Sequence, residues 1–369
     1  MRAKMIEVQL GADTQRISAE LARLGLWVSP LKSSSGELRA FLIDPASAHV
    51  EIQHLECIPG VSAVIGETSP HPLVDSLSHQ EIEAGGFTFG QAQLWRASSR
   101  GGRAPLMIAG PCSFETESLV HQIAEEVASA GGCWLRGGAY KPRTSPYSFQ
   151  GVGEQGLRWA REAADLNGLS VVTEALSEAE VERVARWSDV IQIGTRNMQN
   201  FSLLKRVGEA GKPVLLKRGL CATVDEWLLA GEYVMKYGAP SVIFCERGLR
   251  HYDQSTRNQL DLAAAALLKH QYGLPVIVDP SHAAGRRDLI LPLAIAAIAM
   301  GVDGVMVETH PDPGLARSDA AQALSFTELR ALSAQIGAMR PASQEGSHPS
   351  TLPFDPEVEL PCAGERTRP

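Results

Sequence analysis

Cationic side chains recur at the ends of short apolar segments of this sequence. Together with the hydroxyls beside them, they are Arg136, Lys141, Arg143, Thr144, Ser145, Arg196, Lys217 and Arg247. Any one of these cations could be an ordinary solvated strand end. As a set they are better explained by a bound anion, because positive charges held side by side repel one another unless negative charge lies among them. Since a forked guanidinium matches carboxylate and phosphate oxygens, we expect a small polyanionic substrate.

A second set of residues combines a thiol, an imidazole and two carboxylates. Its members are Cys112, His282, Glu308 and Asp319. Alone, Cys112 would be interpreted as a buried thiol and His282 as a hydrogen-bonded core histidine. As a set they predict a site for one divalent metal ion, and such mixed ligands fit Mn²⁺, Fe²⁺, Co²⁺ or Zn²⁺ without selecting strongly among them.

The elements that must position these residues are eight short apolar runs, which alternate with helical stretches between Leu106 and Ile336. The runs are LMIAG, CWLRG, SVVTE, VIQIG, PVLLK, SVIFC, PVIVD and GVMVE. They are nearly all apolar, as parallel strands covered on both faces are. Eight β/α units in about 230 residues predict an α/β protein whose residues 106–339 form a closed (β/α)₈ TIM barrel. An open doubly wound sheet is the alternative fold.

Such a barrel would bring the two sets of residues together, because its active site lies at the C-terminal ends of the strands. The cations follow strands two, four, five and six, and Glu174 ends strand three. Cys112, His282, Glu308 and Asp319 follow strands one, seven and eight. Closure of the barrel makes these three strands neighbours, so the four side chains can converge on one ion.

The segments that flank the barrel have a different composition. Residues 1–70 show the order strand, helix, strand, strand, helix, strand, which is the ferredoxin-like βαββαβ unit common in small regulatory modules. Residues 71–105 are expected to be a linker with a hairpin in GGFTFGQAQLW. Residues 340–369, rich in Pro, Ser and Glu, are expected to be disordered.

The overall composition excludes several classes of protein. The 369 residues contain 34 Lys and Arg against 42 Asp and Glu, a net charge of −8, which argues against a general nucleic-acid binder. The longest uncharged apolar run has 14 residues, too few to span a bilayer, and Glu7 interrupts the apolar core that a signal peptide would need. Six scattered cysteines without a CxxC pair suggest neither a disulfide framework nor a zinc knuckle. We therefore expect a soluble cytoplasmic protein that binds neither nucleic acid nor membrane.

The motifs around these residues carry a family resemblance. IAGPCSFE, LRGGAYKPRTSPYSFQG, VVTEAL, IQIGTRNMQN, VLLKRG, CERG, TRN, VDPSHAAGRRD and VETHPDP resemble 3-deoxy-D-arabino-heptulosonate 7-phosphate (DAHP) synthase. The similarity is to the short microbial type with an N-terminal ferredoxin-like (ACT-like) regulatory domain. It implies the first step of the shikimate pathway, in which phosphoenolpyruvate, D-erythrose 4-phosphate and water give DAHP and phosphate.

The resemblance also implies roles for individual residues. Phosphoenolpyruvate would be held by Arg136, Lys141, Arg196, Lys217 and Arg247. The sugar phosphate would be held by Arg143, Thr144 and Ser145, and the metal by Cys112, His282, Glu308 and Asp319. Lys141 is the candidate proton donor, and a metal-bound water acting through His282 or Glu174 is the rival.

Further consequences of the resemblance concern regulation and assembly. It suggests feedback inhibition by tyrosine or phenylalanine at the N-terminal domain, and a homotetramer. One competing interpretation is 3-deoxy-D-manno-octulosonate 8-phosphate synthase, which usually has KANRS where this sequence has KPRTS and lacks the front domain. The other is a non-catalytic barrel that serves as a partner or sensor for another enzyme.

Overall fold

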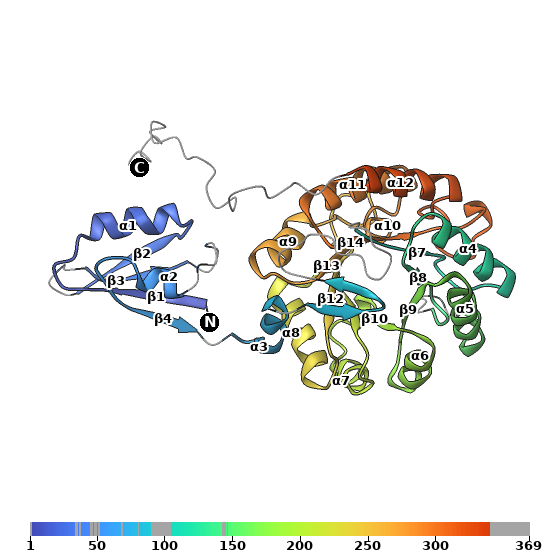
Figure 1. Cartoon of the computed structure of the whole chain (residues 1–369), viewed down its shortest axis with the longest axis horizontal. Coiled ribbons are helices and arrows are strands. Elements are labelled where there is room, and N and C mark those ends of the chain that lie inside the picture. Colours follow the sequence, from blue (N-terminus) through green and yellow to red (C-terminus); the bar gives the residue numbers. More distant parts are fainter. Residues whose placement is uncertain are drawn as a thin grey trace, which may run out of the picture. The chain divides into compact units, whose positions relative to one another are not determined.

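The computed structural model divides the chain into two compact units, one within Arg2–Gly66 and one within Glu67–Pro341 (Figure 1). The structure describes residues 2–33, 36, 38–44, 47, 50, 52–67, 69–79, 81–89, 105–141, 145 and 147–339. The predicted tail, and residues 80 and 90–104 of the predicted linker, lie outside these residues.

The N-terminal unit is a four-stranded sheet with two helices. Its elements are β1 (Arg2–Val8), α1 (Thr14–Arg23), β2 (Val28–Lys32), β3 (Leu38–Ile43), α2 (Ile52–Glu56) and β4 (Val61–Glu67). The strand order is β2-β3-β1-β4, and β3 pairs antiparallel with both β1 and β2. Helix α1 begins where Asp13 accepts a hydrogen bond from the Arg16 amide, and it buries Ile17 and Leu21. The predicted βαββαβ order is therefore confirmed.

A short hairpin covers the N-terminal end of the barrel. After α3 (Pro72–Ser76) and the 3₁₀ turn η1 (Leu77–His79), strands β5 (Ile82–Ala84) and β6 (Phe87–Phe89) pair antiparallel. The hairpin thus starts before the predicted GGFTFGQAQLW segment, because Gly85 and Gly86 form its turn, with φ of 52° and 68°, rather than its first strand. The Gly85 carbonyl accepts a hydrogen bond of 2.9 Å from the Trp134 indole, which fixes the hairpin against the barrel.

The second unit is a closed barrel of eight parallel strands in the order β10-β11-β12-β13-β14-β7-β8-β9. The strands are β7 (Leu106–Gly110), β8 (Trp134–Arg136), β9 (Ser170–Glu174), β10 (Val190–Ile193), β11 (Val214–Lys217), β12 (Val242–Glu246), β13 (Val276–Val278) and β14 (Gly304–Glu308). Each lies within or overlaps one of the eight predicted runs. Pairing of β9 with β10 closes the ring and excludes the open-sheet alternative.

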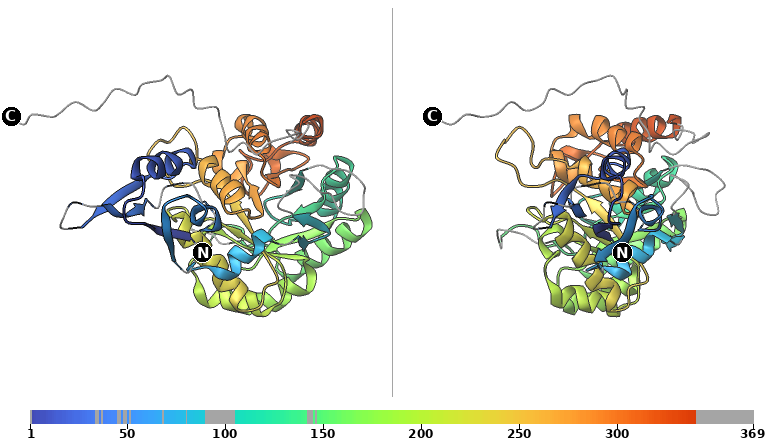
Figure 2. Two further views of the ribbon diagram at one scale, coloured as in Figure 1. Left: turned by 60° about the vertical axis from the view of Figure 1, so that its left-hand side comes forward. Right: turned by 90° about the vertical axis from the view of Figure 1, so that its left-hand side faces the viewer.

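Helices surround this ring of strands (Figure 2). They are α4 (Glu117–Ser129), α5 (Glu154–Asn167), α6 (Val181–Trp187), α7 (Phe201–Glu209), α8 (Val224–Lys236), α9 (Leu262–Ala266), α10 (Pro280–Ala284), α11 (Ile290–Met300) and α12 (Phe326–Ala338). The 3₁₀ turns are η2 (Glu178–Glu180), η3 (Thr195–Asn197), η5 (Arg287–Leu289) and η6 (Pro313–Leu315), and η4 (Leu267–Gln271) is a π-helical segment that continues α9.

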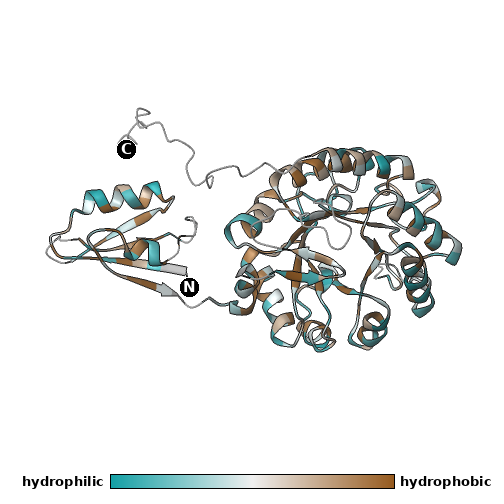
Figure 3. Cartoon of the chain, viewed as in Figure 1, coloured by the Kyte–Doolittle hydropathy of each residue, from teal (hydrophilic) through white to brown (hydrophobic). Residues whose placement is uncertain are grey.

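Local sequence signals start and stop these helices. Thr223 with Glu226, and Ser325 with Glu328, form capping boxes at the starts of α8 and α12. Left-handed Gly168 ends α5. Apolar residues concentrate on the barrel strands, whereas most of the surrounding helices carry both polar and apolar residues (Figure 3). Among the described helices, none combines the length and the apolar character that crossing a membrane requires.

Candidate active site

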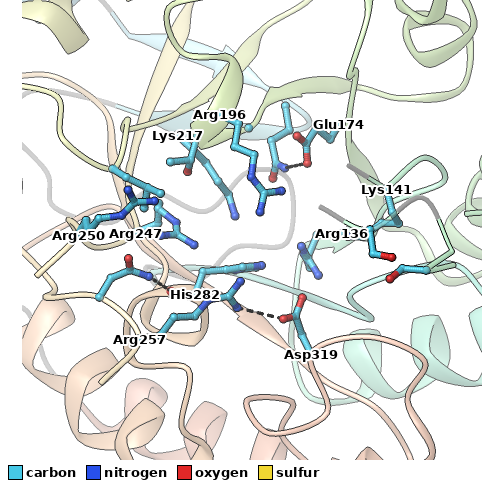
Figure 4. A pocket seen from close by; sticks show the side chains of 17 residues that line it. Arg136, Lys141, Glu174, Arg196, Lys217, Arg247, Arg250, Arg257, His282 and Asp319 are labelled. Atoms are coloured by element: carbon cyan, nitrogen blue, oxygen red, sulfur yellow. Dashed lines mark hydrogen bonds and ion pairs between the residues drawn. The ribbon is translucent and has the colours of Figure 1, made fainter. Parts of the chain in front are cut away.

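A cavity of about 610 Å³ opens at the C-terminal ends of the barrel strands (Figure 4). In the described part of the chain its wall carries seven cations and two carboxylates. The cations are Arg136, Lys141, Arg196, Lys217, Arg247, Arg250 and Arg257, and the carboxylates are Glu174 and Asp319. A protein with net negative charge has thus gathered positive charge in one cavity, as the sequence predicted.

The predicted substrate-binding residues meet in this cavity where the structure describes them. Ser145 lines it together with the five cations predicted to hold a substrate. Arg136 and Lys217 end strands β8 and β11, and Arg196 lies in η3. Arg143 and Thr144 lie outside the described residues.

A buried carboxylate orients Lys217 and His282 together. Lys217 Nζ donates to Asp279 Oδ2 at 2.5 Å, and His282 Nδ1 lies 2.7 Å from the same oxygen. Burial alone would raise the pKa of Asp279, but the charges of His282 and Lys217 outweigh it and hold that pKa well below its usual range. Asp279 is therefore an anion that holds a cavity cation and the imidazole in place.

Two guanidinium groups of the cavity wall have nitrogens that are buried and unsatisfied. Arg247 Nη1 and Arg136 Nε have no hydrogen-bond partner among the described residues. Burial lowers the pKa of Arg247 from its ordinary value. Arg136 is otherwise anchored, because its Nη1 donates to the Pro111 carbonyl at 2.7 Å and to Glu308 Oε1 at 3.0 Å. A buried donor without a partner is costly, so an anion in the cavity would satisfy a need that the protein leaves open.

Three of the four predicted metal ligands converge beside this cavity, and the fourth, His282, contacts one of them. Cys112 Sγ donates to Asp319 Oδ2 at 2.9 Å, and ligand atoms of these two residues and Glu308 all lie within 4.8 Å of one another. His282 Nε2 lies 3.2 Å from Glu308 Oε1. Thiol, imidazole and carboxylates from β14 and from the segments after β7, β13 and β14 thus form a mixed donor set that fits a divalent transition metal.

Burial and neighbouring charges shift the pKa values of these ligands in different directions. Burial and the nearby Glu308 carboxylate raise the pKa of the Cys112 thiol to about 12. Burial also opposes ionisation of Glu308, but His282 and Arg136 outweigh it and lower its pKa. Asp319 is the one non-glycine residue in the described chain with a positive φ, 53°. A strained backbone of this kind is often found at functional sites.

Lys141 and Glu174, the remaining predicted catalytic residues, face the same cavity. Lys141 Nζ donates to the Cys112 carbonyl at 2.7 Å, which places its ammonium between the cavity and the metal ligands. Glu174 Oε2 accepts a hydrogen bond of 3.2 Å from Gln192. A β-carbon at Gly194 would lie 1.9 Å from Glu174 Oε1, so this position must be glycine for the carboxylate to sit where it does.

Several residues of the cavity wall are not among the predicted site residues. Arg250, Arg257 and Asn258 come from the long segment between β12 and α9, and Gln192 from β10. Arg250 lies in a polar, charged segment that is typical of a solvent-exposed loop, so nothing in the sequence indicated that its side chain lines a cavity. Arg257 and Asn258 belong to the TRN motif, which marked the segment without indicating a role.

Comparisons with known proteins match this chain to one family of enzymes. A profile of the DAHP synthetase I family matches residues 90–345. A phospho-2-dehydro-3-deoxyheptonate aldolase of Thermotoga maritima is 45% identical over 285 residues, which are 76% of this chain and 80% of the relative. A crystal structure of DAHP synthase from the same organism has a TM-score of 0.68 at 39% identity, covering 91% of this chain and 96% of that chain.

Another relative is more distant. A 2-dehydro-3-deoxyphosphooctonate aldolase of Acidithiobacillus ferrooxidans is 32% identical over 232 residues, which are 58% of this chain and 81% of the relative. A truncated form of 3-deoxy-D-arabino-heptulosonate 7-phosphate synthase from Thermotoga maritima has a TM-score of 0.62 at 43% identity, covering 70% of this chain and 90% of that chain.

Proposed function

The chain belongs to the DAHP synthetase I family, and we propose that its cavity condenses phosphoenolpyruvate with D-erythrose 4-phosphate and water to give DAHP and phosphate. This is the activity of a 3-deoxy-7-phosphoheptulonate synthase, the first step of the shikimate pathway. The observation that carries the proposal is a seven-cation cavity beside the converging Cys112, Glu308 and Asp319.

The cations account for binding of phosphoenolpyruvate, which carries a carboxylate and a phosphate on three carbons. Arg136, Lys141, Arg196, Lys217 and Arg247 are assigned to it. The unsatisfied Nη1 of Arg247 and Nε of Arg136 support this role, because each can donate to an anionic oxygen. Arg143, Thr144 and Ser145 are assigned to the phosphate of the sugar.

Cys112, His282, Glu308 and Asp319 are assigned to a divalent metal ion, with Mn²⁺, Fe²⁺, Co²⁺ and Zn²⁺ as the candidates. The donor set supports this, since the thiol and carboxylate oxygens already crowd together and Glu308 is fully buried. When bound, such an ion supplies Lewis-acid polarisation of an aldehyde oxygen.

The protein's own residues would orient the substrates and move the protons. The enol carbon of phosphoenolpyruvate forms a bond to the aldehyde carbon, and the resulting alkoxide takes a proton. Lys141 is the proposed donor, and a water oriented by His282 or Glu174 is the rival source. Water then adds at the carbon that bears the phosphate, and phosphate leaves by cleavage of the C–O bond. Lys217 and Arg247 would stabilise the charge on the departing phosphate.

The test is phosphate release from the metal-stripped protein, with each divalent metal added back, and with a chelator as the control. Erythrose 4-phosphate should be turned over far faster than arabinose 5-phosphate. The reverse preference would favour the octulosonate 8-phosphate synthase alternative. Absence of release with every metal would favour the non-catalytic barrel.

We further propose that the N-terminal unit binds an aromatic amino acid effector, tyrosine or phenylalanine, and that the protein is a homotetramer. The confirmed βαββαβ order supports a regulatory module. Condensation rates measured with each amino acid added singly identify the effector, and light scattering measures the assembly.

Deleting residues 1–70 should leave activity and abolish inhibition; inhibition that persists would contradict the regulatory role. The expected cytoplasmic location stays a prediction.

A further inference from the structure

Arg257 contacts a candidate metal ligand from the wall of the cavity. Its Nη1 donates to Asp319 Oδ1 at 3.0 Å (Figure 4). The same nitrogen donates to Gln322 Oε1 at 3.0 Å. Arg257 also lines the cavity, and 44% of its side chain is exposed. One guanidinium therefore touches both the space for an anionic substrate and a residue assigned to the metal.

Gln322 extends this contact to a second ligand. Its Nε2 donates to Glu308 Oε2 at 2.6 Å, and its side chain is buried. The amide thus accepts from Arg257 on one side and donates to Glu308 on the other. Because the amide and guanidinium have fixed, planar geometries, this link restricts how the Glu308 carboxylate can turn.

The backbone at Arg257 is anchored on the helix that carries a third ligand. The amides of Arg257 and Asn258 donate to the carbonyls of Ala284 and Ala283 at 2.9 and 2.8 Å. Asn258 Nδ2 donates to the His282 carbonyl at 3.0 Å. The contact is close, since a β-carbon at Gly285 would lie 2.6 Å from Arg257 Cβ. The Arg257–Asn258 dipeptide is therefore hydrogen-bonded directly to His282 and Asp319. It is linked to Glu308 through Gln322.

We propose that Arg257 is a positioning residue of the metal centre, which holds Asp319 directly and Glu308 through Gln322. Asp319 needs such a restraint, because its positive φ is a conformation that non-glycine residues rarely adopt. Partners that orient metal ligands in this way change metal affinity although they never touch the ion. The inference rests on the proposed function, since it takes these carboxylates as ligands.

The two effects of a guanidinium beside a metal site have opposite signs, which makes the proposal testable. As a positive charge, Arg257 repels a cation, so its removal would tighten metal binding. As a positioning group, it pre-orients the ligands, so its removal would weaken metal binding. We expect the second effect to dominate.

The experiment is a Mn²⁺ titration of the metal-stripped full-length protein, followed by the electron paramagnetic resonance of free Mn²⁺. Arg257→Gln should weaken binding by about 10- to 100-fold, as removing other ligand-orienting groups does. Arg257→Lys, which keeps a charged donor, should recover part of the loss. Arg250→Gln is the matched control, because Arg250 lines the same cavity and makes no side-chain hydrogen bond to the four ligands in the described chain. It should bind Mn²⁺ nearly as tightly as the unsubstituted protein.

An affinity for Arg257→Gln that is unchanged or tighter overturns the proposal, and so does an equal loss in Arg250→Gln. Thermal unfolding in chelator checks that the metal-free fold is intact. If Arg257→Gln does not fold, Arg257→Lys tests the direct contact to Asp319 and Gln322→Met tests the link to Glu308; an unchanged Kd in both variants overturns the proposal. Cys112→Ala distinguishes the two failures. If Cys112→Ala binds Mn²⁺ normally, the assignment of the metal site is wrong. If Cys112→Ala loses Mn²⁺ binding and Arg257→Gln does not, only the positioning role of Arg257 is wrong.

Discussion

Two buried lysine–aspartate pairs lie at opposite ends of the same barrel. At the N-terminal end, Lys269 Nζ is 2.7 Å from Asp303 Oδ1, and the Val276 amide donates to the other oxygen of Asp303 at 2.8 Å. At the C-terminal end, Lys217 Nζ is 2.5 Å from Asp279 Oδ2. Both lysine side chains are about equally hidden, with exposed fractions of 6% and 5%.

The two carboxylates nevertheless differ in the direction of their pKa shifts. Burial raises the pKa of Asp303 because Lys269 offsets it only in part, whereas His282 and Lys217 overcome burial and lower the pKa of Asp279. Neither Lys269 nor Asp303 lines the cavity of about 610 Å³, whereas Lys217 of the second pair does. We therefore expect the N-terminal pair to contribute mainly to stability and the C-terminal pair mainly to the site, which is the usual division between the two faces of such barrels.

The largest expected effect is on stability, at the N-terminal pair. Lys269→Met leaves a buried carboxylate without its partner and should lower the free energy of unfolding by about 3–5 kcal/mol. Catalysis by the folded protein should be little affected. Urea unfolding and steady-state kinetics measure the two quantities. The double variant Lys269→Met/Asp303→Asn, which keeps an acceptor for Val276, should recover part of the loss; no recovery would contradict the ion-pair explanation.

The C-terminal pair should show the opposite balance, with a large loss of activity and a smaller loss of stability. Lys217→Ala removes a charge-assisted contact to the substrate and should lower kcat/KM by about 10²–10³-fold. The free energy of unfolding should fall less than in Lys269→Met, because Asp279 keeps its hydrogen bond to His282. A near-normal rate at low phosphoenolpyruvate would show that the two pairs do not differ in this way.

The metal side of the C-terminal end can be tested at Cys112. Cys112→Ala removes a soft ligand and should weaken Mn²⁺ binding by about 100-fold, with a parallel loss of activity. The measurement is activity against free Mn²⁺ after metal stripping. Full activity in this variant at low metal would rule out Cys112 as a ligand.

The smallest effect is expected for a more exposed pair outside the ring, His71 and Asp75, whose side chains are 2.8 Å apart and 8% and 36% exposed. Burial alone would lower the pKa of His71, but Asp75 raises it overall. The pair therefore stabilises the fold fully below the ordinary histidine pKa of about 6.5, and the stabilisation is lost as pH rises through the raised value. We expect the pair to contribute less than about 1 kcal/mol to the free energy of unfolding. Asp75→Asn should remove the pH dependence of Tm that this pair causes. An unchanged pH profile would contradict it.

Much of the site could be predicted because residue type and position in a β/α repeat are both visible in a sequence. Apolar runs predicted each strand, and the rule that barrel sites lie at C-terminal strand ends then placed Arg136, Lys217 and Glu308 together. The metal set needed the further assumption of closure, since Cys112 and Asp319 are 207 residues apart. The hairpin was misplaced because two glycines can form either a turn or the start of a strand.

The sequence by itself determined the order of the barrel strands, five of the cavity cations and the identity of the four candidate ligands, because these depend on local periodicity and chemical type. Only the tertiary structure decided which carboxylate holds which cation. Asp279 beside Lys217, and Arg257 beside Asp319, are contacts between segments whose separation in sequence carries no information about distance. The pKa directions likewise follow from burial and from neighbours across the barrel, which exist only once the ring has closed.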